Sequence, residues 1–132
     1  MRRRLDEARV GRLATVRPDG TPHVVPFVFA LDGDALYSSV DAKPKRTPEL
    51  QRIRNIQANP AVEVVVDAYH EPWRGIWWVR LQGRAEVLEE GPERDQGIRL
   101  LIEKYPDYEE EPPEGAIVVV RIERWQGWEF RP

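Results

Sequence analysis

The sequence predicts a mainly β (α+β) fold: a small closed β-barrel of about six to seven antiparallel strands with two or three short helices. Three observations predict it. Strand-like runs recur along the chain and are separated by turn sequences such as Pro18-Asp19-Gly20 and Asp32-Gly33-Asp34. Only two segments carry a clear helical pattern. A length of 132 residues suits one core, so residues 1–132 are expected to form one domain.

The first strands flank the turn at Pro18-Asp19-Gly20. The run from Val24 to Leu31 is almost continuously apolar, which predicts a strand buried on both faces. Pro26 within it has no N–H to donate to a neighbouring strand, so we expect an edge or a bulge there. The run "ALYSSV" predicts the third strand.

A helix is predicted next. Thr47-Pro48 suits an N-cap followed by proline at the first helical position. Leu50, Ile53 and Ile56 give the helix one apolar side. Asn59-Pro60 is expected to end it, because the residue before proline disfavours the α conformation.

The second half continues with "AVEVVVDAYH", whose alternation predicts a half-buried strand. "GIWWVRLQGRAEVLEE" predicts a long strand with a bulge at Gly83 and a polar, aromatic side that includes Trp78 and Arg80. Residues 92–105 predict an amphipathic helix, and the acidic "PDYEEEPPEG" after it a solvated loop. The final run predicts two strands around Gln126-Gly127.

Positive charge gathers between the third strand and the first predicted helix. Residues 41–55 hold five basic and two acidic side chains, although the whole chain carries a net charge of −3. An ordinary solvated surface is the general expectation for such a run. Here, however, Ser38, Ser39 and Thr47 add hydroxyl donors, and a helix N-terminus faces the same region. Together these groups predict a cradle for an anion, most simply a phosphate.

Composition excludes several functions. The chain has no cysteine, so disulfides, thiolate nucleophiles and iron–sulfur clusters are ruled out, and its two histidines give no metal-binding spacing. A net charge of −3 argues against a nucleic-acid-binding barrel, which normally needs a basic surface. No apolar run approaches the length of a membrane span, and the opening "MRRRLDEARV" has no apolar stretch of a secretory signal. We therefore expect a cytoplasmic protein with neither a membrane nor a nucleic acid as partner.

Four stretches follow one another in an order typical of a known family: "RVGRLATVRPDGTPHVVPFVFALDGDALYSSVDAKPKR", "LQRIRNIQANPAVEVVVDAY", "WWVRLQGRAEV" and "IERWQGWEF". With them the chain resembles the pyridoxamine phosphate oxidase-like, FMN-binding split β-barrel proteins, and more narrowly the branch that uses the deazaflavin coenzyme F420. The resemblance runs from about Ala8 to Phe130. It implies a split β-barrel and a homodimer with two cofactor sites at the subunit interface.

The resemblance also implies which residues bind the cofactor. Backbone groups around Pro26 and Phe27 lie against the ring, and a second group of residues holds the ribityl chain and phosphate: Ser38, Ser39, Lys43, Lys45 and Arg46. The strand with Trp78 and Arg80 faces the partner subunit. Coenzyme F420 carries an acidic glutamate tail, for which Arg52 and Arg54 are candidates.

The implied activity is hydride transfer between coenzyme F420 and a small-molecule substrate that the sequence does not identify. An FMN oxidoreductase of the same fold, and a flavin or F420 carrier or sensor with little turnover, remain alternatives. The cofactor carries this chemistry, which suits a sequence without a catalytic triad or paired carboxylates. His23, Tyr37 and Asp41 are polar enough to relay a proton, but nothing in the sequence selects one of them as the catalytic residue.

Overall fold

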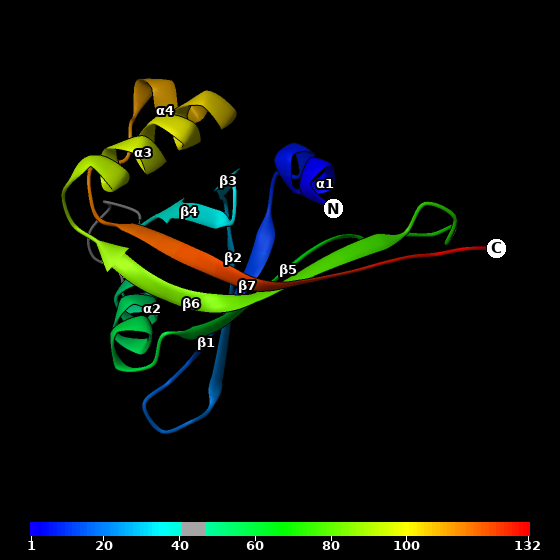
Figure 1. The fold of residues 1–132 in the computed structure, drawn as a ribbon, viewed down its shortest axis with the longest axis horizontal. Helices are drawn as coiled ribbons and strands as arrows, with labels where there is room; N and C mark the ends of the chain where they lie inside the picture. Colours follow the sequence, from blue (N-terminus) through cyan, green and yellow to red (C-terminus); the bar gives the residue numbers. More distant parts are fainter. Residues whose placement is uncertain (41–46) are drawn as a thin grey trace.

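The computed structural model describes residues 1–40 and 47–132, and the side chains of 1–40 and 51–132 (Figure 1). Seven antiparallel strands form one sheet in the order β2-β1-β5-β6-β7-β4-β3. The strands are β1 Gly11–Val16, β2 Pro22–Phe27, β3 Ala30–Asp32, β4 Ala35–Ser39, β5 Ala61–Ala68, β6 Trp77–Leu88 and β7 Ile117–Glu129. The helices of the described residues are α1 Arg2–Glu7, α2 Thr47–Ala58, α3 Pro92–Lys104 and α4 Asp107–Glu110. The mainly β fold is as predicted and agrees with the split β-barrel that the family resemblance implies, but the described residues form four helices where two or three were expected.

The two longest strands, β6 and β7, form the centre of the sheet. They pair from Trp77 opposite Glu129 to Leu88 opposite Ile117, and the register shifts between Gln82 and Gly83. The predicted bulge at Gly83 is therefore confirmed. Glycine is required there, because a Cβ atom at this position would lie 2.2 Å from the carbonyl oxygen of Arg121.

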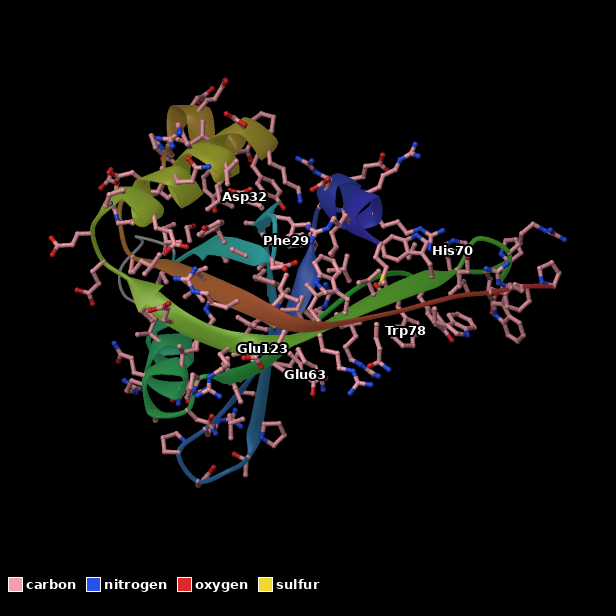
Figure 2. All side chains as sticks on the ribbon, viewed as in Figure 1. Phe29, Asp32, Glu63, His70, Trp78 and Glu123 are labelled. Atoms are coloured by element: carbon pink, nitrogen blue, oxygen red, sulfur yellow. The ribbon has the colours of Figure 1, made fainter. Side chains whose placement is uncertain are left out.

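One side of the sheet encloses the core. Alternate residues of β5 and β6 lie in it, as the predicted alternation requires: Val62, Val64, Val66, Val79, Leu81 and Ala85. Leu5 of α1 is fully buried in the same cluster, although no helix was predicted at this position. Figure 2 shows Glu63, Trp78 and Glu123 on the opposite side of β6 and β7 from Phe29 and α1.

The prediction for Val24 to Leu31 is wrong in two respects. The segment breaks into β2 and β3 at residues 28–29, and β2 stands at one end of the strand order. Val24 is 61% exposed, so β2 is not buried on both faces. An edge strand has only one strand neighbour, which is why apolar character alone overestimated its burial. The edge position expected from Pro26 is confirmed.

The last part of the chain also differs from prediction. Gln126-Gly127 makes no turn, because β7 continues through it as one strand paired with Arg80 and Val79 of β6. The acidic stretch predicted as a loop contains the short helix α4. The predicted helix over 92–105 is confirmed as α3, with Pro92 at its first turn, and it packs on β3, β4 and β7.

Candidate functional site

The end of β4 is the first part of the predicted cofactor site. Ser38 is buried, with 3% of its surface exposed, and its backbone pairs with Val118 of β7. Ser39 is half-buried, and its Oγ atom lies 3.0 Å from the hydroxyl oxygen of Tyr108 in α4. The next residue, Val40, donates its N–H to the carbonyl oxygen of Ala116 at 3.1 Å. These bonds fix where β4 leaves the sheet and the basic segment begins.

The basic segment joins β4 to α2. Lys43, Lys45 and Arg46, three of the predicted phosphate-binding residues, lie outside the described residues. The helix that follows runs from Thr47 to Ala58, so it already includes the predicted N-cap residue Thr47 and ends before Asn59-Pro60 as predicted. The segment that holds these cations therefore leads directly into the N-terminus of α2, the end of a helix where backbone N–H groups have no partner within the helix.

Arg52 lies on the side of α2 that faces the barrel, with 7% of its surface exposed. The pKa of His23 in β2 lies below its usual 6.5. Burial of the imidazole is the largest cause, and the positive charges of Arg17 and Arg52 add to it. Asn55, one turn further along α2, is fully buried and donates to the hydroxyl of Thr15 at 2.9 Å. The inner side of α2 is thus partly polar, which its apolar spacing did not reveal.

Pro26 and Phe27, the residues predicted to lie against the ring, belong to the edge strand β2. Pro26 is exposed and pairs with Arg12 of β1. Phe27 is buried, and its ring lies 5.5 Å from the ring of Phe29. The Phe27 side chain therefore belongs to the core, and the backbone of β2 is the part of this strand that a flat ring can approach.

Trp78 and Arg80 lie on the side of the sheet away from the core, as predicted from their alternation. Trp78 stacks on Trp128 with ring centres 6.4 Å apart and an angle of 18° between planes. The Arg80 guanidinium lies 5.0 Å from the centre of the Trp78 ring and donates to Gln126 at 2.9 Å. Glu63 of β5 is 4.0 Å from Arg80. We call these five residues the outer patch.

The outer patch and the end of β4 lie at different ends of β7. Ser38 pairs with Val118, whereas Arg80 pairs with Gln126. Eight residues of a strand span about 26 Å. The residues predicted to contact one cofactor therefore form two separate groups within one chain.

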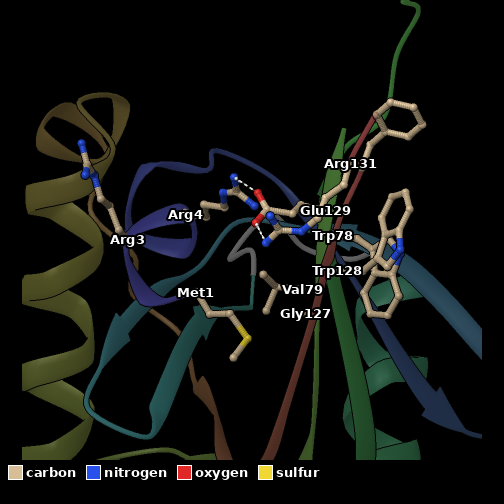
Figure 3. Close-up of a pocket in the computed structure, with 10 residues that line it drawn as sticks. Met1, Arg3, Arg4, Trp78, Val79, Gly127, Trp128, Glu129 and Arg131 are labelled. Atoms are coloured by element: carbon tan, nitrogen blue, oxygen red, sulfur yellow. Dashed lines mark hydrogen bonds and ion pairs between the residues drawn. The ribbon is translucent and has the colours of Figure 1, made fainter. Parts of the chain in front are cut away.

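A pocket of about 900 Å³ lies between α1 and the ends of β6 and β7 (Figure 3). Arg4 and Arg131 both contact the carboxylate of Glu129, at 3.3 and 2.9 Å. The rings of Trp78 and Trp128 point to the other side of the strands. The sequence did not predict this site, because α1 and the end of β7 are brought together only by the fold.

A network of charged groups fixes Tyr37 of β4. Its hydroxyl donates to Glu93 of α3 at 2.8 Å, and burial followed by this bond raises the pKa of Tyr37 to about 12. The Glu93 carboxylate accepts hydrogen bonds from Arg121 and from Tyr37. These bonds, the first more than the second, lower its pKa to about 2. The hydroxyl of Tyr37 is therefore a weak acid, and its proton is already used in the hydrogen bond to Glu93. Tyr37 is poorly suited to the proton relay considered above. Asp41 lies outside the described residues.

Groups of metal ligands and membrane-spanning helices are both absent from the part of the chain that the structure describes. Among its residues, no group of three or more histidine, aspartate or glutamate side chains is placed to hold a metal ion. None of its helices combines the length and the apolar character needed to cross a membrane.

Comparison with known proteins identifies the family. Residues 1–129 match the family described as pyridoxamine 5'-phosphate oxidase. A search of curated proteins finds no match. A structure named F420 reductase is 32% identical, with a TM-score of 0.65 and 92% of each chain covered.

Two further structures are similar. A FAD-binding protein from Mesorhizobium loti is 30% identical, with a TM-score of 0.71, covering 96% of this chain and 89% of its own. A conserved hypothetical protein from Mycobacterium tuberculosis is 22% identical, with a TM-score of 0.76, covering 95% and 79%, and supports the fold alone. On the match over residues 1–129, the chain belongs to the pyridoxamine 5'-phosphate oxidase family.

Proposed function

We propose that the protein is an oxidoreductase that transfers a hydride between the deazaflavin coenzyme F420 and a small-molecule substrate. The observation that carries this proposal is the 32% identity, over 92% of each chain, with the structure named F420 reductase. When bound, the deazaflavin ring supplies the hydride chemistry, while the protein supplies binding, orientation and electrostatics.

The donors near the end of β4 fit an anionic cofactor. Ser38 and Ser39 bring hydroxyl groups to the point where the chain leaves the sheet. Lys43, Lys45 and Arg46 follow in sequence, and α2 begins immediately after them. Hydroxyl, ammonium and guanidinium groups with a helix N-terminus form the donor set that a phosphate requires. In this proposal they hold the ribityl phosphate, and Arg52 contributes positive charge from within α2.

The proposed active form is a homodimer with the cofactor between the subunits. The outer patch supports this proposal, because Trp128 is 44% exposed and stacks on Trp78 on a sheet face that α3 leaves open. The separation of about 26 Å within one chain also favours it. A second copy is then needed to place Trp78 and Arg80 near the end of β4.

An FMN enzyme of the same fold is the second candidate. The similarity to a FAD-binding protein at 30% identity favours it. The two candidates differ in the ring that the backbone of β2 must accept and in the acidic tail that only coenzyme F420 carries beyond its phosphate. A protein that binds either cofactor but does not turn it over would be a carrier or sensor.

The first test is a fluorescence titration of the purified protein with coenzyme F420 and, in parallel, with FMN. Micromolar or tighter binding to F420 alone supports the main proposal, and preference for FMN supports the second. Turnover of the reduced cofactor with candidate substrates then separates an enzyme from a carrier. Binding of neither cofactor would contradict both proposals.

The basic segment is tested by replacing Lys43, Lys45 and Arg46 together with alanine. Each charged hydrogen bond lost should weaken cofactor binding by about 1.5–3 kcal/mol. The matched control replaces Arg74 and Arg99, two exposed arginines, together with Arg3, whose side chain is 88% exposed. This control removes the same charge and should leave affinity nearly unchanged. Equal loss in both variants would refute a local phosphate site.

A further inference from the structure

A pair of hydroxyl groups joins the end of β4 to α4. Ser39 Oγ and Tyr108 Oη are 3.0 Å apart, although the two residues are 69 positions apart in sequence. Both side chains are half-buried. Ser39 is the last residue of β4 and one of the residues proposed to bind the cofactor phosphate. Tyr108 thus reaches this region from a part of the chain to which no role is assigned above.

The position of Tyr108 is fixed by its neighbours. Its ring meets the Tyr105 ring edge to face, with centres 6.1 Å apart, and its backbone N–H donates to the Tyr105 carbonyl at 2.9 Å. Tyr105 is itself held at Phe29, the residue before β3. Its hydroxyl accepts from the backbone N–H of Phe29 at 3.1 Å and donates to the carbonyl oxygen of Phe29 at 3.0 Å. The contact between Tyr108 and Ser39 is therefore part of the packing of the α3–α4 unit on the barrel.

Hydrogen-bond capacity sets the direction of this contact when an anion is present. A hydroxyl has one proton to donate and two lone pairs to accept with. A phosphate oxygen only accepts, so Ser39 can bind it only by donating its single proton. Ser39 must then accept from Tyr108, whose hydroxyl supplies the proton of this bond. Hydrogen bonds linked in this way polarise and strengthen one another.

We propose that Tyr108 is a positioning residue for a phosphate-bearing cofactor: it donates to Ser39 and so directs the Ser39 hydroxyl proton to the phosphate. This inference rests on the proposed function, in which Ser39 binds that phosphate. It assigns part of the affinity for the phosphate to α4. The carboxylates beside Tyr108, on Asp107, Glu109 and Glu110, are exposed to solvent, which weakens their repulsion of an anion.

The test is Tyr108→Phe, which removes one oxygen atom and keeps the ring against Tyr105. Dissociation constants are measured for FMN and riboflavin, and for coenzyme F420 and the same deazaflavin without phosphate and tail. In each pair, the preference for the phosphorylated ligand should fall by about 3- to 10-fold. Affinity for the ligand without phosphate should stay constant. An unchanged preference overturns the inference.

Two controls separate this role from a structural one. In a Ser39→Ala protein, adding Tyr108→Phe should change the preference no further, because the relay is already broken. Independent, additive losses would contradict the relay. Tyr69→Phe removes the same atom from a tyrosine that is 70% exposed and should have no effect. An equal effect of Tyr69→Phe would overturn the assignment.

The outcomes distinguish this inference from the proposed function. A wild-type protein that binds neither FMN nor coenzyme F420 refutes both. A wild-type protein that binds one of them, with an unchanged phosphate preference in Tyr108→Phe, refutes only the role of Tyr108.

Discussion

The carboxylate of Glu93 should stabilise the fold above pH 4.5 and lose this effect as the pH falls towards 2. Arg121 contacts Glu93 at 2.6 Å, and the Tyr37 hydroxyl donates to it at 2.8 Å. These partners lower the Glu93 pKa from 4.5 to about 2. Because the folded state holds the charged form more strongly, the stabilisation is complete above the unfolded-state pKa and vanishes below the folded-state pKa.

The magnitude follows from this shift. A difference of about 2.5 pKa units corresponds to roughly 3.4 kcal/mol if nothing weakens the interaction. The Glu93 side chain is 38% exposed, however, so solvent screening reduces the effect. We expect about 1–2 kcal/mol for the charge of Glu93 at pH 7.

The assay compares wild type with Glu93→Gln by urea unfolding at several pH values and one fixed protein concentration. The wild type should be more stable by about 1–2 kcal/mol at pH 7, and the difference should shrink between pH 4.5 and 2. Other carboxylates titrate in both proteins and largely cancel in the difference. A difference that stays constant down to pH 2, or none at pH 7, would refute this explanation.

Three further predictions concern the fold and the proposed dimer. Gly83→Ala should destabilise the protein by about 1–3 kcal/mol in thermal or urea unfolding, because the new methyl group meets the backbone of Arg121; a neutral result would contradict the tight bulge. Asn55→Ala should lower the unfolding free energy by about 1–3 kcal/mol, since the buried Thr15 hydroxyl loses its partner. Trp78→Ala should raise the dissociation constant of the proposed dimer in analytical ultracentrifugation; a dimer that is unchanged at low concentration would contradict an interface at the outer patch.

Local sequence patterns correctly predicted the features that depend on the strand itself and little on its neighbours. Alternating valines located β5, because every second residue of that strand is buried. Gly83 and Pro26 marked a bulge and an edge through backbone properties that depend little on the rest of the fold. Val24 misled the prediction, because hydrophobicity does not show whether a second strand will cover a given position.

The candidate site was predicted only where its residues are close in sequence. Ser38 and Ser39 stand at the end of β4 as expected, beside the basic segment. Their contact with Tyr108 was not predicted, because it joins residues 69 positions apart and no local pattern marks it. The same holds for the bonds from Arg121 of β7 to Glu93 of α3.

The strand order has a consequence for how the chain folds. β4 does not pair with β5, the next strand in sequence, but with β7, so that Ala35 lies opposite Arg121. Contacts between such distant segments require a large loop to close first, and proteins rich in them fold slowly. During synthesis, β4 cannot pair with β7 until residues 117–129 have left the ribosome. Until then, the edge of β4 is a surface on which nascent chains can aggregate, and expression at low temperature or with chaperones should increase the folded yield.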